Sequence, residues 1–169
     1  LKDIYFRDHS LEFLRQLPEG KLFAMFTYLW APHPPLRVPE PYASMYPPEK
    51  LVLPDNIGIT AEGEPPLRRK GVPAQLAEQV PKEEWRQVWS AHLALTTMAD
   101  DVLGMILEEL KKQGKYENTC VVFTADHGDS LGQHQMYQKM EMYEESVKIP
   151  LVIRLPGAKT GKTAKLVSH

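Results

Sequence analysis

Three short apolar runs stand out in the pattern of hydrophobic and polar positions, at residues 21–29, 119–124 and 150–155. They contain β-branched and aromatic residues, which favour strands. Runs without polar alternation are typical of strands buried on both faces, as in a parallel sheet covered by helices. The pattern therefore predicts three buried strands.

Helical periodicity occurs between these runs. From residue 81 to residue 112, apolar residues recur at spacings of three and four, with acidic residues near the start and lysines before Gly114 at the end. A shorter helix is predicted over residues 11–17, where leucines recur at helical spacing before Pro18. The alternation of strands and helices predicts an α/β fold with a mixed, mainly parallel sheet covered by helices.

Ligand-type residues follow the second apolar run. Asp126, His127 and Asp129 come just after it, where open α/β sheets bind ligands beyond the carboxyl ends of their strands. An Asp oxygen and a His nitrogen can share one divalent cation. A hard cation such as Ca²⁺ needs six or more ligands, so others must come from elsewhere. The alternative is a polar, solvated loop after a buried strand.

A histidine also follows the first apolar run. His33 lies in the segment A-P-H-P-P-L, between prolines that restrict its backbone. If the strands before His33 and Asp126 are parallel neighbours, both side chains open onto one crevice. Otherwise His33 is an ordinary loop residue. The following residues 39–81, rich in proline and poor in periodicity, are either a functional segment or a wrapping surface loop.

A dense set of motifs begins at Thr124 with T-A-D-H-G-D-x-L-G-x-H, and continues with Lys139, Y-E-E-S at 143–146 and I-P-L-V-I-R-L-P-G at 149–157. With these motifs and spacings the chain resembles the type I sulfatases of the alkaline-phosphatase-like superfamily. The resemblance implies that residues 1–169 are a central to C-terminal part of a sulfatase catalytic domain, incomplete at both ends. It also implies an alkaline-phosphatase-like fold.

The resemblance implies a role for several residues. Asp126 and His127 would bind a divalent cation, Ca²⁺ with Mg²⁺ or Mn²⁺ as alternatives, which neutralises the sulfate oxygens. Lys139 would hold a sulfate oxygen, while His33 would contact the sulfate or help the leaving oxygen depart. His134 is a candidate for a supporting position behind the ligands, with an ordinary loop role as the alternative.

Other acidic residues receive structural interpretations. Asp129 lies outside the expected ligand set, and Glu144 and Glu145 are expected to make hydrogen bonds behind the site. Asp100 and Asp101 fall in the middle of the long predicted helix, where adjacent side chains diverge by about 100° and do not converge on one ion.

The chain lacks the motif C/S-x-P-S/A-R, whose Cys or Ser becomes the formylglycine nucleophile of sulfatases, and it lacks the family's earlier Asp pair. The expected parent is thus a sulfuric ester hydrolase acting on a small-molecule or saccharide sulfate ester, with this chain inactive alone and a missing N-terminal segment as its partner. Residues 165–169 resemble the opening of a further segment. A phosphonate or phosphate ester hydrolase of the superfamily and a non-catalytic binding module stay open.

Composition adds limits. The 169 residues are 43% hydrophobic, enough for one sizeable core, and the net charge of −2 gives no support for nucleic acid binding. The cluster Arg68-Arg69-Lys70 is expected to be solvated surface. The single cysteine, Cys120, excludes an intrachain disulfide and is expected to be buried, and His92 is expected to be a satisfied packing residue. No apolar run reaches membrane-spanning length. The resemblance suggests a periplasmic, secreted or lysosomal location, with the compartment undetermined.

Overall fold

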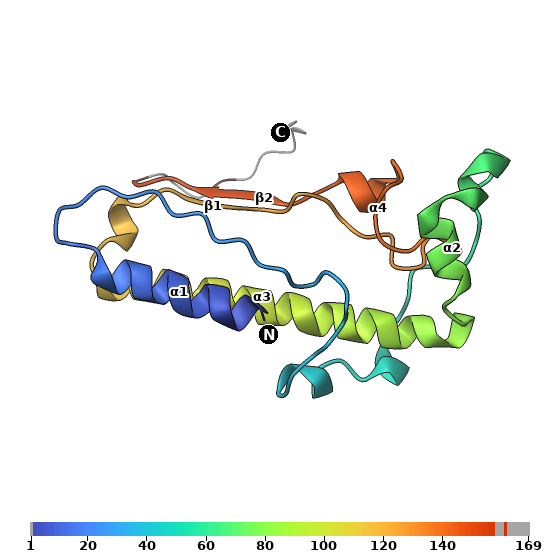
Figure 1. Ribbon diagram of the computed structural model, residues 1–169, viewed down its shortest axis with the longest axis horizontal. Coiled ribbons are helices and arrows are strands. Elements are labelled where there is room, and N and C mark those ends of the chain that lie inside the picture. Colours follow the sequence, from blue (N-terminus) through green and yellow to red (C-terminus); the bar gives the residue numbers. More distant parts are fainter. Residues whose placement is uncertain (1, 158–160, 162–169) are drawn as a thin grey trace.

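The computed structural model describes residues 2–157 and residue 161, so the segment 165–169 lies outside the described residues. Two helices, α1 (Lys2–Gln16) and α3 (Trp85–Lys112), lie side by side beneath a pair of strands (Figure 1). The remaining elements are α2 (Val72–Glu78), α4 (Glu144–Val147), β1 (Val121–Thr124), β2 (Leu151–Arg154) and short 3₁₀ turns at Tyr42–Ser44, Pro48–Lys50, Pro66–Lys70, Lys82–Glu84 and Tyr116–Asn118.

Helix α3 confirms the long helix predicted from the apolar periodicity. Val102, Ile106 and Leu110, spaced by one turn, form a buried cluster with Leu14 of α1. Burying a side chain of this size contributes about 1.5–3 kcal/mol, so this cluster is the main link between the two helices. The helix ends at Lys112, and Gly114 just beyond its cap has a φ of 64°, the left-handed conformation that favours glycine.

Helix α1 begins at Lys2, nine residues before the predicted start at residue 11. Its first turns have little apolar periodicity, and polar side chains anchor them instead. The buried carboxylate of Asp3 accepts hydrogen bonds from the backbone N–H groups of Trp30 (2.5 Å) and Ala31 (3.0 Å). These are tertiary contacts, which the local sequence pattern does not contain.

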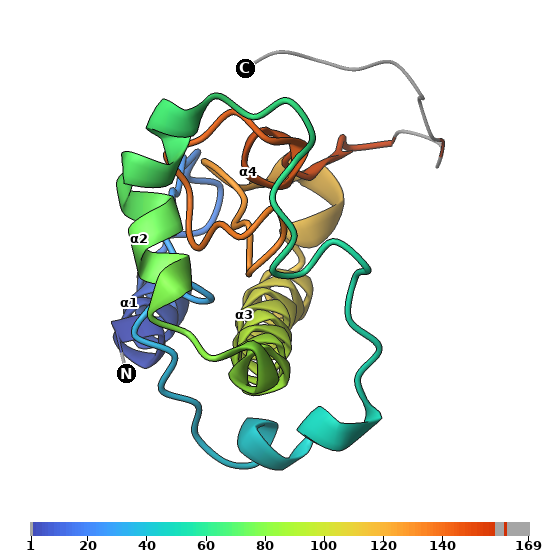
Figure 2. The same ribbon diagram turned by 90° about the vertical axis from the view of Figure 1, so that its right-hand side faces the viewer.

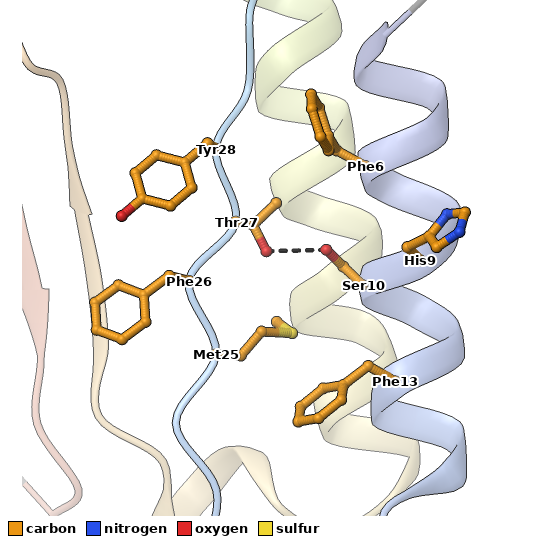
Figure 3. A pocket seen from close by; sticks show the side chains of 8 residues that line it. All are labelled: Phe6, His9, Ser10, Phe13, Met25, Phe26, Thr27 and Tyr28. Atoms are coloured by element: carbon orange, nitrogen blue, oxygen red, sulfur yellow. Dashed lines mark hydrogen bonds between the residues drawn. The ribbon is translucent and has the colours of Figure 1, made fainter.

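The segment 21–30 packs on the helices with strand-like alternation. Met25 packs on the core cluster of α1 and α3, whereas Phe26 and Tyr28 are 80% and 76% exposed. Figure 3 shows Met25 and Thr27 directed toward the helices and Phe26 and Tyr28 directed away from α1; a cavity of about 290 Å³ lies between the segment and α1. Ser10 and Thr27 share a hydrogen bond of 2.9 Å across it. Only one face of this predicted buried strand is therefore covered.

The two strands form an antiparallel pair, with Val121 opposite Arg154 and Thr124 opposite Leu151. The segment 21–30 runs beside β1 in the same direction (Figure 1) but joins no backbone ladder within the described part of the chain. The predicted mainly parallel sheet is therefore not confirmed. An apolar run does not encode strand direction, and the chain from β1 to β2 turns back without the crossover that a parallel pair needs.

The strands are also more exposed than predicted. Val122 and Phe123 of β1 and Val152 of β2 are exposed, and so is Cys120, which the sequence placed in the core. The physical reason is that the described residues place no second layer over the face turned away from α1 and α3 (Figure 1).

The first part of the proline-rich segment wraps α3 on the side opposite α4 (Figure 2). The Tyr42 hydroxyl donates to Asp101 (2.8 Å), the Tyr46 hydroxyl pairs with Thr97 (2.7 Å), and Ser90 donates to the Tyr46 carbonyl (2.5 Å). Asp101 therefore has the structural role expected of it. None of the helices in the described ranges is both long and apolar enough to cross a membrane.

His92 of α3 differs from expectation, because its buried Nδ1 has no hydrogen-bond partner within the described residues. Burial lowers the pKa of His92 below its usual 6.5, although the charge of Asp129 opposes this effect. Since the folded state then resists protonation, the unfolded chain binds more protons below the unfolded pKa, and the free energy of unfolding falls as pH drops through that value.

We expect His92→Leu to flatten the pH dependence of stability between about pH 7 and pH 5, because it removes the group whose pKa differs between the two states. Urea unfolding at several pH values measures this slope. His9→Leu, on the exposed side of α1, is the matched control and should keep it. The interpretation is wrong if His92→Leu and the parent show equal slopes.

Candidate functional site

His33 and Lys139 meet although they are 106 residues apart, with Nζ of Lys139 at 2.5 Å from Nε2 of His33. Nδ1 of His33 lies 2.7 Å from the carbonyl oxygen of Pro34. A carbonyl can only accept, so Nδ1 carries the proton and Nε2 presents its lone pair. The Lys139 ammonium therefore donates to a neutral imidazole. The contact combines a fixed positive charge with a nitrogen that can take up a proton.

Trp30 fixes the loop that carries His33. Its ring lies against the imidazole, with centroids 4.7 Å apart, and its Nε1 donates to the Pro34 carbonyl at 3.3 Å. The His33 N–H donates to the Trp30 carbonyl at 2.8 Å. Because Asp3 holds the backbone of Trp30, the position of His33 is set by α1.

Asp126 and His127 follow β1 and place two possible metal-ligand atoms close together. Nδ1 of His127 lies 2.8 Å from the Gly128 carbonyl and donates to it, so Nε2 is the nitrogen that a neutral ring would offer to a metal. That Nε2 lies 3.6 Å from Oδ2 of Asp126, whose side chain is 87% exposed. The rings of His127 and His33 have centroids 6.4 Å apart. The four predicted site residues are therefore brought together, and the roles assigned to them stay predictions.

This donor pair fits part of a cation site. A carboxylate oxygen and an imidazole lone pair can bind one divalent ion, and the exposure of Asp126 leaves room for it. Within residues 2–157 and 161, no group of three or more His, Cys, Asp or Glu side chains could hold a metal. The described residues thus supply two ligands, and a complete shell needs more.

The loop 129–140 carries Lys139 and is closed by a side chain. Oδ1 of Asp129 accepts from the N–H groups of Leu131 and Gln138, both at 3.0 Å. Oδ1 of Asp129 therefore holds the backbone of the loop. Five non-glycine residues of this loop have positive φ: Leu131, His134, Gln135, Gln138 and Met140. This conformation costs on the order of 1 kcal/mol for each residue, so contacts from elsewhere must hold it.

His134 lies behind this loop. Its ring stacks on Tyr143 (centroids 4.3 Å apart), and its Nε2 lies 3.3 Å from Oε1 of Glu145. Glu145 also accepts from Gln133 at 3.0 Å, as expected of a supporting residue. Glu144 instead pairs with Lys148 at 2.6 Å on the surface, so the expectation that it bonds behind the site is wrong. Glu144 is the first residue of the short helix α4 and is exposed.

Sequence reasoning missed two residues, Arg69 and Glu64. Arg69 was interpreted as solvated surface, yet it pairs with Glu64 at 2.8 Å and donates to two backbone carbonyls of the loop 129–140. No signal in the sequence could have found this contact, because it joins segments that neither periodicity nor a motif connects.

A family model described as Sulfatase matches residues 2–169. The chain belongs to the sulfatase family. Two relatives are the multifunctional alkaline phosphatase superfamily protein PehA of Trinickia caryophylli, 31% identical over 90% of this chain and 32% of its own length, and an arylsulfatase of Clostridium perfringens, 31% identical over 89% and 31%. These matches confirm the resemblance drawn from the motifs.

A solved phosphonate monoester hydrolase from Silicibacter pomeroyi is structurally similar, with a TM-score of 0.75 and 33% identity over 94% of this chain and 33% of that one. The sulfatase-family chain thus spans about a third of the length of these relatives. The similarity supports an alkaline-phosphatase-like fold, although the parallel sheet is not seen.

Gly128, next to the candidate ligands, allows a close backbone approach. Its N–H donates to the Ser146 carbonyl at 2.8 Å, and a Cβ added at this position would lie 1.9 Å from the Glu145 carbonyl oxygen. We expect Gly128→Ala to lower the free energy of unfolding by about 1–3 kcal/mol, because backbone atoms must shift.

The matched control is Gly104→Ala on the exposed side of α3, where an added Cβ meets nothing within 4 Å. It should raise stability by about 0.5–1 kcal/mol through helix propensity. Urea unfolding of both variants measures the difference. A Gly128→Ala protein as stable as its parent would contradict the close approach.

Proposed function

We propose that the protein containing this chain hydrolyses a sulfate ester. The observation that carries the proposal is the contact between Lys139 and His33, which lies beside the donor pair of Asp126 and His127. A tetrahedral oxyanion needs a positive charge at its oxygens, and ester cleavage needs a group that moves a proton at the leaving oxygen. Family membership supports the same reaction class.

Each residue has a distinct task in this proposal. Lys139 binds a sulfate oxygen as a point charge, which takes its N–H away from His33. Nε2 of His33 is then free to take up a proton from solvent and to pass it to the leaving alcohol oxygen. Trp30 keeps the imidazole oriented while this exchange of partners takes place.

Asp126 and His127 would hold the divalent metal that the sulfatase family implies. When bound, such an ion supplies Lewis-acid stabilisation of the charge on the sulfate oxygens. Ca²⁺ remains the first expectation, with Mg²⁺ or Mn²⁺ as alternatives. An imidazole nitrogen is a poorer ligand for Ca²⁺ than a carboxylate oxygen, so this pair favours Mn²⁺ more than an all-oxygen set would.

The nucleophile and the other metal ligands must come from outside the described residues. In the sulfatase resemblance these are a formylglycine and an Asp pair from an N-terminal segment of the same domain. We infer that this segment covers the exposed apolar side chains of β1, β2 and residues 21–30, because apolar faces of this kind require a partner layer in water.

The two candidate substrates are both esters of a tetrahedral oxyanion. A small-molecule or saccharide sulfate ester is the proposed substrate. A phosphonate monoester is the second candidate, favoured by the similarity to the phosphonate monoester hydrolase from Silicibacter pomeroyi. Lysine and a divalent cation serve either anion, so the described residues do not separate the two.

The activity test compares an aryl sulfate and an aryl phosphonate monoester as substrates of the whole metal-loaded protein. We expect Asp126→Asn and Lys139→Met each to lower kcat/KM by a factor on the order of 100 to 1,000, the usual effect of removing one electrostatic group from a site. Glu144→Gln, which removes a charge from the exposed pair with Lys148, is the control and should keep the parent rate.

The outcome separates the candidates. A larger kcat/KM for the sulfate supports the proposal, and a larger value for the phosphonate replaces it with the second candidate. Turnover of the sulfate that survives both Asp126→Asn and Lys139→Met would show that the site is wrong.

The isolated chain should lack useful activity, because its sequence lacks the nucleophile motif and its described residues bring together only two candidate metal ligands. Supplying Ca²⁺, Mg²⁺ or Mn²⁺ with an activated aryl sulfate should leave the background rate unchanged. Turnover by the purified chain that disappears in Asp126→Ala would prove the chain self-sufficient.

A further inference from the structure

We propose that Arg69 is a positioning residue that holds the loop 129–140 in the conformation that places Lys139 against His33. Arg69 lies on the 3₁₀ turn Pro66–Lys70, far from Lys139 in the sequence. The inference rests on the proposed function, because the loop matters to catalysis through Lys139. Within the described residues, Arg69 makes no hydrogen bond to His33 or Lys139.

The guanidinium of Arg69 donates hydrogen bonds to the backbone of the loop. Nη1 donates to the Gln135 carbonyl at 3.1 Å, and Nη2 donates to the His134 carbonyl at 3.2 Å. His134 and Gln135 both have φ of 53°, so Arg69 satisfies two carbonyls at a place where the backbone is left-handed. A planar fork of N–H donors suits two adjacent carbonyls, and a lysine does not reproduce it.

Glu64 fixes the guanidinium itself. Its carboxylate lies 2.8 Å from Nη2 and accepts from Nε at 2.9 Å, and its side chain is 1% exposed. Its second oxygen accepts from the Tyr143 hydroxyl at 3.1 Å. A carboxylate this deeply buried must be paired, so Arg69 is held before any substrate arrives.

The neighbouring chain supports the same loop. The Asn56 carbonyl accepts from His134 (3.2 Å), the Pro73 carbonyl accepts from Tyr137 (3.0 Å), and Gly58 donates to the Gly132 carbonyl (2.8 Å). These are neutral backbone bonds, whereas Arg69 makes charge-assisted ones, which are about twice as strong. Arg69 is therefore the side chain from outside the loop that makes charge-assisted bonds to two of its backbone carbonyls, and its removal should loosen the strained loop.

The test is steady-state kinetics of the whole metal-loaded protein with an aryl sulfate. We expect Arg69→Met to lower kcat by roughly tenfold to a hundredfold, because a small displacement of a charged group from its reactive position has effects of this size. The apparent affinity for the metal should be unchanged, since Asp126 and His127 are not in the loop. Arg69→Lys should recover part of the rate, and Lys70→Met, an exposed neighbouring charge, is the control.

A double-mutant cycle with Lys139→Met distinguishes positioning from general destabilisation. If Arg69 acts through Lys139, Arg69→Met should cost almost nothing further in the Lys139→Met background. Independent, multiplicative losses would overturn the proposal, and so would a parent-like kcat in Arg69→Met. If Arg69→Met does not fold, Tyr143→Phe removes the hydroxyl that donates to Glu64, and the same cycle with Lys139→Met decides.

Hydrogen exchange keeps this inference separate from the proposed function. If Lys139→Met leaves turnover unchanged, the catalytic role of Lys139 is wrong. The effect of Arg69 on the loop is then tested by hydrogen exchange of the loop amides alone. Faster exchange at Leu131 and Gln138 in Arg69→Met than in Lys70→Met would then show that Arg69 holds the loop. Equal exchange in the two variants would overturn it.

Discussion

The position of His33 in the site depends on the hydrogen bonds that the buried carboxylate of Asp3 accepts. This carboxylate accepts from the backbone of Trp30 and Ala31, and thereby ties the start of α1 to the end of the segment that carries His33. The apolar cluster between α1 and α3 then fixes this unit to the long helix. The segment 21–30 forms no backbone ladder within the described residues. The hydrogen bonds that Asp3 accepts therefore help to hold its register. A polar contact here does what strand pairing does in most sheets.

The sequence was a good guide to which side chains the structure brings together and a poorer one to the topology. Asp126, His127 and Lys139 stand in a motif with fixed spacings, so they could be named before the structure. The strand direction could not be predicted, since an apolar run such as Val121–Thr124 has the same composition in either orientation. The exposure of Cys120 was missed because burial depends on a covering layer and not on the residue itself.

The contacts that support the site were harder to predict than the site. Arg69 and Glu64 belong to no periodic element, and their partners His134 and Gln135 lie in a loop whose left-handed backbone uses no glycine at these positions. Local rules assign positive φ to glycine and basic clusters to solvent. Both rules fail here because long-range hydrogen bonds compensate for the local cost, as is common near functional sites.

The hydrogen bond between Lys139 and His33 has a consequence for selectivity. In the free site the ammonium already has an acceptor, and any ligand must offer it a better one. A neutral hydroxyl or carbonyl gives little gain over an imidazole lone pair, whereas an anionic oxygen adds a full charge to the same hydrogen bond. His33 thus competes with any ligand for the Lys139 ammonium. In the proposed reaction, a neutral molecule of the right shape would leave the two side chains paired, whereas an oxyanion would separate them and expose the nitrogen proposed to move the proton.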